Sequence, residues 1–149
     1  MNPHPEASAE NQMQEDLQNH LALCCKTLEL VERAIRLNPH YPPYYLYQLG
    51  LAQFAMNRLD EAATSLERAL ALNRGDYWSQ RLLLTTYGLL GRRADAAKLL
   101  EAIKGNEKRG YIAVFDPLTI RAAAYWYPFA ERADVERFAE GLRKAGVPE

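Results

Sequence analysis

The sequence predicts an all-α protein, built as a solenoid of antiparallel helix hairpins with about seven helices and a C-terminal capping hairpin. Three observations support this fold class. Apolar residues recur at spacings of three and four, which is the period of a helix. Two stretches of the chain match each other at an offset of 34 residues. Each stretch holds two apolar-periodic segments separated by a short polar turn, as a helix hairpin requires.

Composition fits one compact unit and excludes several functions. The chain has 149 residues, of which 48% are hydrophobic and 25% charged, and its net charge is −1. Because positive and negative charges nearly balance, the chain has no long-range electrostatic field that would recruit nucleic acid or an anionic membrane. We find no membrane-spanning run and no export signal, so we expect a cytoplasmic protein. The adjacent Cys24 and Cys25 point in different directions on a helix and cannot form a stabilising disulfide.

The first periodic segment predicts one long helix over residues 13–37, preceded by a disordered tail over residues 1–12. The tail is polar and contains two prolines. The helix should stop before Pro39, because proline disfavours helical geometry in the residue before it. Its apolar stripe has spacings of 4, 3, 4, 3 and 4: Leu17, Leu21, Cys24, Leu28, Val31 and Ile35.

The two matching stretches predict hairpins over about residues 43–74 and 77–104. Leu49 aligns with Leu83, and Leu66 aligns with Leu100. Small residues, Ala62 and Ala96, stand where two helices would cross closely. The polar turns are Asn57-Arg58 and Gly91-Arg92. Upstream, residues 32–38 match residues 67–73 at an offset of 35, and the loop containing Pro42 and Pro43 can absorb the extra residue.

The remainder of the chain breaks this period and predicts a capping hairpin over residues 117–146. Asp116-Pro117 can start its first helix and Pro128 ends that helix. Asp134 can cap the second helix, which Gly146 closes. The aromatic cluster of residues 125–129 either completes the core of this hairpin or forms a docking surface.

Residues 24–104 resemble the tetratricopeptide repeat (TPR) family. The resemblance is carried by the 34-residue period, Leu49-Gly50, Ala62, Ala69 and the run Leu37-Asn38-Pro39. It implies stacked hairpins with a concave binding wall. The sequence departs from the family pattern at three places: Gln53 takes an aromatic position, Leu84 replaces the glycine found as Gly50, and Arg74 stands where a closing proline is common.

The C-terminal part looks like the repeat extension of some bacterial class III adenylate/guanylate cyclases. The resemblance lies in residues 127–129, 134–138 and 141–149. It implies a connection with signalling, although no cyclase domain fits in this chain.

Nothing in the sequence indicates catalysis. The chain lacks the nucleophile, zinc-protease and phosphate-loop motifs, and no nucleophile is visibly paired with a base. His20 and Cys24 share a helix face and could give a metal two ligands, but a structural zinc site needs about four. We therefore predict no enzyme activity, no catalytic residue, no cofactor and no metal.

The TPR resemblance implies that the first helix of each hairpin lines the concave wall. By register, the groove residues are Tyr44, Tyr47, Gln48, Leu51, Phe54, Trp78, Arg81, Leu82 and Thr85. Tyrosine, tryptophan and arginine often dominate interface energetics. Alternatively, the aromatic residues pack within the fold. The carboxylate clamp of some relatives is missing, since its places hold Tyr47, Leu51 and Arg81.

The sequence therefore predicts a non-catalytic scaffold or adaptor that binds a protein or peptide through an aromatic groove. One alternative is a regulatory module of, or partner to, a nucleotide cyclase or similar signalling enzyme. Another is a small enzyme with its site in the groove. The stripe through Leu17 and Leu21 also offers a surface for a second copy, so homodimerisation through the first helix is a further hypothesis.

Overall fold

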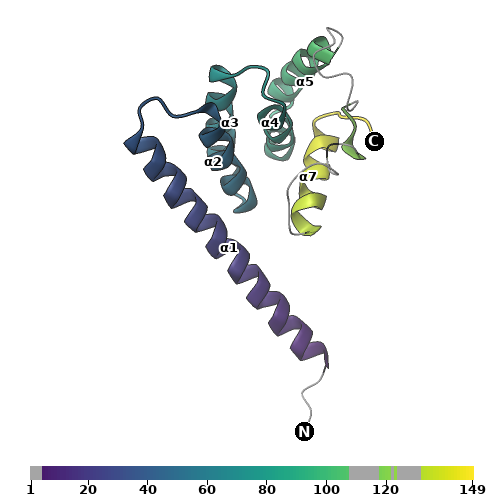
Figure 1. Ribbon diagram of the computed structural model, residues 1–149. Helices are drawn as coiled ribbons and strands as arrows, with labels where there is room; N and C mark the ends of the chain where they lie inside the picture. The colour runs from purple at the N-terminus through teal and green to yellow at the C-terminus, as the bar shows by residue number, and fades with distance from the viewer. Residues whose placement is uncertain (1–4, 108–117, 122, 124–131) are drawn as a thin grey trace.

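The computed structural model describes residues 5–107, 118–121, 123 and 132–149, and every regular element among them is a helix (Figure 1). This confirms the predicted all-α class. The helices are α1 (Pro5–Leu37), α2 (Pro43–Ala55), α3 (Leu59–Leu72), α4 (Tyr77–Leu90), α5 (Arg93–Glu107) and α7 (Arg132–Lys144).

Helix α1 begins upstream of the expected start at residue 13. Its described part starts at Pro5, so most of the segment predicted as a tail is helical. Two physical factors account for the difference. Proline suits the first turn of a helix, where its missing N–H is not needed. The following residues are mostly good helix formers, and Glu6 lies near the positive end of the helix dipole.

Helices α2 and α3 form the first hairpin. Pro43 occupies the first turn of α2. The turn between the helices contains Asn57 in the left-handed conformation, with φ of 59°. Within the hairpin, a Cβ at Gly50 would come within 2.7 Å of the Leu66 side chain, so glycine is what permits this close crossing.

Helices α4 and α5 form the second hairpin, and Gly91, the counterpart of Asn57, has φ of 71°. The Asp76 side chain caps α4 by accepting a hydrogen bond of 2.9 Å from the Ser79 backbone N–H. Helices α4 and α5 pack less extensively than α2 and α3. Leu84, which replaces the glycine of the first hairpin, is fully buried.

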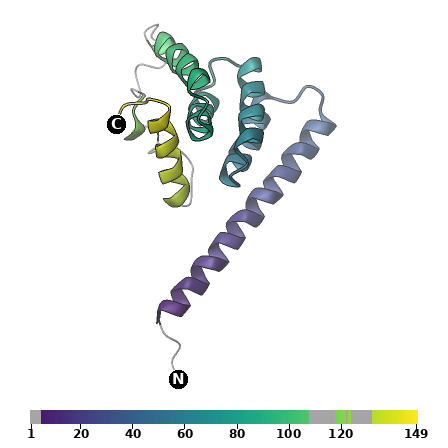
Figure 2. The ribbon, with the colours of Figure 1, turned by 180° about the vertical axis from the view of Figure 1, so that it is seen from behind.

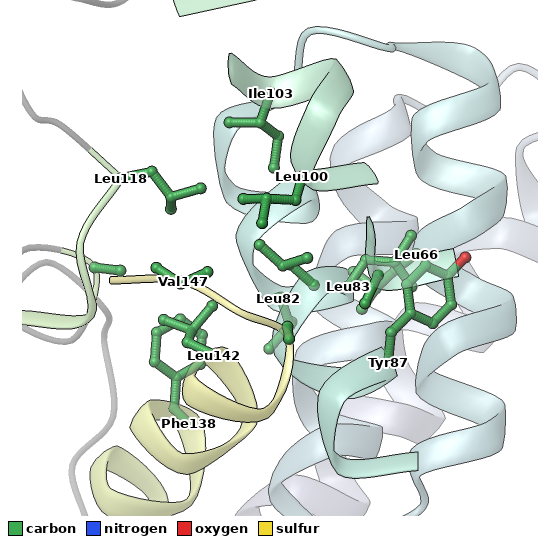
Figure 3. Packing of buried hydrophobic residues seen from close by; sticks show 14 of the residues in the cluster. Leu66, Leu82, Leu83, Tyr87, Leu100, Ile103, Leu118, Phe138, Leu142 and Val147 are labelled. Carbon is green, nitrogen blue, oxygen red and sulfur yellow. The ribbon is translucent and has the colours of Figure 1, made fainter. Parts of the chain in front are cut away.

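Helix α7 packs along α4 and completes the core (Figure 3). It begins at Arg132, two residues before the expected cap at Asp134. Gly146 ends the segment with φ of 88°, and the Val147 N–H donates back to the Leu142 carbonyl at 3.0 Å. The predicted first helix of the capping hairpin, and the aromatic cluster of residues 125–129, lie mostly or wholly outside the described residues.

The contact between α4 and α7 is a backbone contact. A Cβ at Gly88 would lie 1.9 Å from the Gly141 carbonyl oxygen, and a Cβ at Gly141 would lie 2.5 Å from the Thr85 carbonyl oxygen. Figures 1 and 2 place α1 at one side of the molecule, next to α2, with α7 on the far side of α4. The N-terminal half of α1 extends past the end of α2.

Candidate partner-binding surface

Two exposed aromatic residues occupy equivalent positions in the first turns of α2 and α4. Each of these helices runs antiparallel to α3, so their N-terminal turns lie at the same end of the molecule (Figure 1). Tyr44 is 60% exposed and Trp78 is 37% exposed. Together with the half-buried Gln48, we call Tyr44 and Trp78 the aromatic patch.

Neighbouring side chains hold the aromatic patch in place. The Gln48 amide donates a hydrogen bond to the Tyr44 hydroxyl, and the Tyr44 ring lies 6.1 Å from that of Tyr47. On α4, Trp78 and Tyr77 meet edge to face with ring centroids 5.2 Å apart. Rings fixed before binding lose less conformational entropy when a partner arrives.

Three other groove residues predicted from the sequence are buried or half-buried. Arg81 is only 2% exposed, and its guanidinium lies 3.3 Å from the Tyr77 ring centroid. Tyr47 is buried in the hydrophobic core, and Leu51 packs against that core while half-buried. Tyr47 and Arg81 therefore pack beneath the aromatic patch. For Tyr47 this is the alternative in which the aromatic residue packs within the fold.

Helix α7 covers the predicted groove residues Phe54 and Thr85. The Thr85 hydroxyl donates a hydrogen bond of 2.6 Å to the Phe138 carbonyl. The Phe54 and Phe138 rings meet edge to face at 6.5 Å. Leu82 is also buried in this core. The structure thus brings α7 onto the C-terminal ends of α2 and α4 and leaves their N-terminal turns accessible.

A polar cluster that the sequence did not predict ties α1, α2 and α7 together. The Arg137 guanidinium donates to the Phe54 and Ala55 carbonyls, at 2.7 and 3.3 Å, in the last turn of α2, where carbonyls have no partner further along the helix. It also bonds the Asp134 carboxylate at 3.0 Å. The other carboxylate oxygen lies 3.1 Å from His20 Nε2 on α1. Asp134 was expected as a helix cap and Phe54 as a groove residue, but no sequence pattern predicts the contacts that join α7 to α1 and α2, because these contacts span more than 80 positions.

The His20 and Cys24 pair faces Asp134 rather than a ligand set. Cys24 Sγ lies 3.9 Å from His20 Nε2. Within the described ranges, no group of three or more histidine, cysteine, aspartate or glutamate residues could hold a metal ion. The two cysteines are free thiols. The contact between His20 and Asp134 links α1 to α7.

Cys24 should alkylate slowly at neutral pH and accelerate at alkaline pH. Burial raises the pKa of the Cys24 thiol, and the nearby Asp134 charge raises the pKa further. Because the thiolate is the nucleophile, a raised pKa lowers the reactive fraction at pH 7. Iodoacetamide labelling of a Cys25→Ser variant, followed by mass spectrometry from pH 7 to pH 10, measures this rate. A rate that levels off below pH 8.5, the ordinary thiol value, would contradict the prediction.

A separate pocket opens between the second helices of the two hairpins. It has a volume of about 360 Å³, and its lining residues are Glu67, Leu70, Ala71, Leu83, Tyr87, Asp95, Lys98, Leu99 and Ala102. At its edge the Tyr87 hydroxyl donates to Glu67 at 2.8 Å. Burial and this carboxylate raise the pKa of Tyr87, so its hydroxyl stays protonated. The sequence did not predict this pocket, because the pocket exists only through the spacing of α3 and α5 in the folded chain.

The comparison with known families finds a match to the segment that forms the first hairpin. Residues 43–76 match the tetratricopeptide repeat family. The match covers α2, α3 and the turn to α4, so the aromatic patch lies partly on the matched segment and partly on the helix that follows it. No curated protein and no solved structure is significantly similar to the chain. Across residues 5–107 and the described C-terminal segments, no helix is long and apolar enough to cross a membrane.

Proposed function

We propose that this protein is a non-catalytic scaffold that binds a protein or peptide through the aromatic patch. The observation that carries the proposal is the pair Tyr44 and Trp78, exposed at equivalent positions of neighbouring helices although both are large aromatic residues. Tetratricopeptide repeats generally mediate protein interactions, which supports the same function. Because α7 covers Phe54 and Thr85, the partner would contact the N-terminal turns of α2 and α4.

The chemistry of the aromatic patch favours an apolar or aromatic peptide segment. Tyr44, Gln48 and Trp78 are uncharged, and each carries a group that can form hydrogen bonds. No pair of titratable groups lies in the aromatic patch, which disfavours the alternative of a small enzyme. The regulatory module of a nucleotide cyclase stays an alternative proposal that rests on the sequence resemblance alone. The cytoplasmic location is likewise a proposal from composition.

A Tyr44→Ala/Trp78→Ala double variant should lose the partner while keeping its fold. Truncating two central aromatic residues of an interface weakens binding at least tenfold. Partners recovered by affinity purification with the intact protein would be tested in direct titrations against both proteins. Circular dichroism at 222 nm would show that the helices of the variant are retained.

Leu72→Ala provides the control, because it truncates another exposed large hydrophobic side chain, on α3, that is not part of the aromatic patch. Partner binding by this control should match that of the intact protein. Equal binding by the double variant would move the interaction to another surface. Loss of binding by both variants would show that the effect is not specific to the aromatic patch.

Self-association through α1 is a second, separate proposal. The sequence predicts this self-association from the apolar stripe through Leu17 and Leu21. Leu21 is 39% exposed on α1, and the Leu17 side chain lies outside the described ones. When a second surface covers exposed leucines on a helix, their apolar side chains leave water, and this favours association.

A further inference from the structure

An arginine lies beside the loop that leads into α2. This loop, residues 38–42, ends two positions before Tyr44 of the aromatic patch. The Tyr41 hydroxyl in the loop accepts a hydrogen bond of 3.0 Å from the Arg68 guanidinium of α3. Arg68 is exposed and lies in the last two turns of α3. Its positive charge therefore faces solvent at the end of the molecule that carries the aromatic patch.

A second arginine lies in the loop that leads into α4. Arg74 is exposed in this loop, residues 73–76, four positions before Trp78. The Arg74 carbonyl accepts a hydrogen bond of 2.7 Å from the Gln80 side chain, and Gln80 is buried. This contact fixes the backbone of the loop against the first turn of α4. The charge of Arg74 is therefore held near the aromatic patch.

The helices that carry the aromatic patch offer these arginines no free carboxylate. The first turns of α2 and α4 contain neither aspartate nor glutamate. Asp76 lies in the loop before α4, but its carboxylate caps that helix by accepting the hydrogen bond from the Ser79 backbone N–H. A carboxylate at this position also interacts favourably with the positive end of the helix dipole. Asp76 therefore already has a partner within the fold.

Glu67 is the neighbour of Arg68 in the sequence, and it too has other partners. Its carboxylate accepts a hydrogen bond of 2.8 Å from the Tyr87 hydroxyl and lies 3.1 Å from the Arg92 guanidinium. Among the residues that the structure describes, no carboxylate pairs with Arg68 or Arg74. The aromatic patch therefore has two arginines beside it whose charge the fold does not neutralise.

Two arginines at the opposite end of the hairpins are paired locally. Arg58, in the turn before α3, bonds the Glu61 carboxylate at 2.8 Å. Arg92, in the turn before α5, bonds the Asp95 carboxylate at 2.8 Å. In both cases the acidic residue stands three positions further along the chain. The sequence provides no acidic residue three or four positions from either arginine beside the aromatic patch.

We propose that the partner is a peptide segment with an apolar or aromatic centre and acidic residues on both sides of that centre. The centre contacts Tyr44 and Trp78, and the flanking carboxylates pair with Arg68 and Arg74. Arginine suits this role, because its guanidinium can donate two parallel hydrogen bonds to one carboxylate. A basic segment would meet like charges, which disfavours its binding. This inference deepens the proposed function and rests on it.

Selection from a phage-displayed library of random peptides against the full chain tests the inference. Each selected peptide is then screened against the Tyr44→Ala/Trp78→Ala double variant. Peptides that need the two aromatic residues should contain more aspartate and glutamate than the starting library. If these peptides show no excess of acidic residues, the inference is wrong and the proposed function stands. If no selected peptide needs the aromatic residues, both are overturned.

Charge reversal tests the role of the two arginines. The tightest-binding selected peptide should bind an Arg68→Glu/Arg74→Glu variant about tenfold more weakly in a fluorescence polarisation titration. Arg58→Glu/Arg93→Glu is the matched control, because it makes the same change of charge in the turns at the opposite end of the hairpins. Salt screens charges at that distance, so the control should bind as the unchanged protein does. Equal weakening by both variants would contradict the role of Arg68 and Arg74.

Changes in the peptide test the same contacts without altering the protein. The selected peptide is synthesised again with every aspartate and glutamate replaced by asparagine or glutamine. The neutral peptide should bind the unchanged protein about tenfold more weakly than the acidic one. Affinity for the acidic peptide should also fall as salt concentration rises, whereas affinity for the neutral peptide should change little. A neutral peptide that binds as tightly as the acidic one would overturn the inference.

Discussion

Gly88→Ala should separate α7 from α4 and lower the free energy of unfolding by about 3 kcal/mol or more. The added Cβ would lie 1.9 Å from the Gly141 carbonyl oxygen and 3.0 Å from the Ala145 backbone nitrogen. These are backbone atoms, so no side-chain rotation relieves the clash. Helix α7 must shift as a whole, and Phe138 and Leu142, both fully buried, lose their contacts. Urea unfolding followed by circular dichroism measures the change.

Gly105→Ala is the matched control for this prediction. Gly105 also lies within a helix, α5, but a Cβ there would meet no atom within 4 Å. Alanine should therefore be neutral or stabilise by up to about 1 kcal/mol, from helix propensity alone. If Gly88→Ala unfolds within about 1 kcal/mol of the unchanged protein, the close approach of α4 and α7 is not what holds the C-terminal helix.

The repeat hairpins were predictable because their contacts are local in the sequence. Asn57 and Gly91 mark equivalent turns, and each adopts the left-handed conformation that asparagine and glycine tolerate best. Gln53, a departure from the family pattern, is explained by its buried hydrogen bond with Ser65. Both residues lie within one hairpin, so each departure is compensated nearby.

The position of α7 was not predictable from the same pattern. Its contacts join residues more than 50 positions apart, as in the Thr85 hydrogen bond to Phe138, and no period relates them. Register alone therefore assigned Phe54 and Thr85 to an open groove. Tyr44 and Trp78 are exposed in the first turns of α2 and α4, and their role in binding stays a prediction.

Arg137→Ala should lower the free energy of unfolding by about 2 to 4 kcal/mol, because one side chain satisfies several groups at the junction of α2 and α7. Its guanidinium bonds the Phe54 and Ala55 carbonyls, the Asn57 side chain and Asp134. It also lies 4.8 Å from the Phe54 ring centroid. Without it, two helix-end carbonyls lose a donor and the buried Asp134 carboxylate loses its cation.

The control for Arg137→Ala is Arg132→Ala, which removes another arginine one turn earlier in α7. The Arg132 side chain is 92% exposed and bonds Glu136 at 2.9 Å, so its loss should cost less than about 0.5 kcal/mol.

A double-mutant cycle with Asp134→Ala separates the two roles of Arg137. If neutralising Asp134 is its main role, Arg137→Ala should cost little in the Asp134→Ala background. If capping α2 dominates, most of the cost persists there, and α7 is held chiefly by the carbonyls at the end of α2. A cost below 0.5 kcal/mol in both backgrounds would contradict both roles.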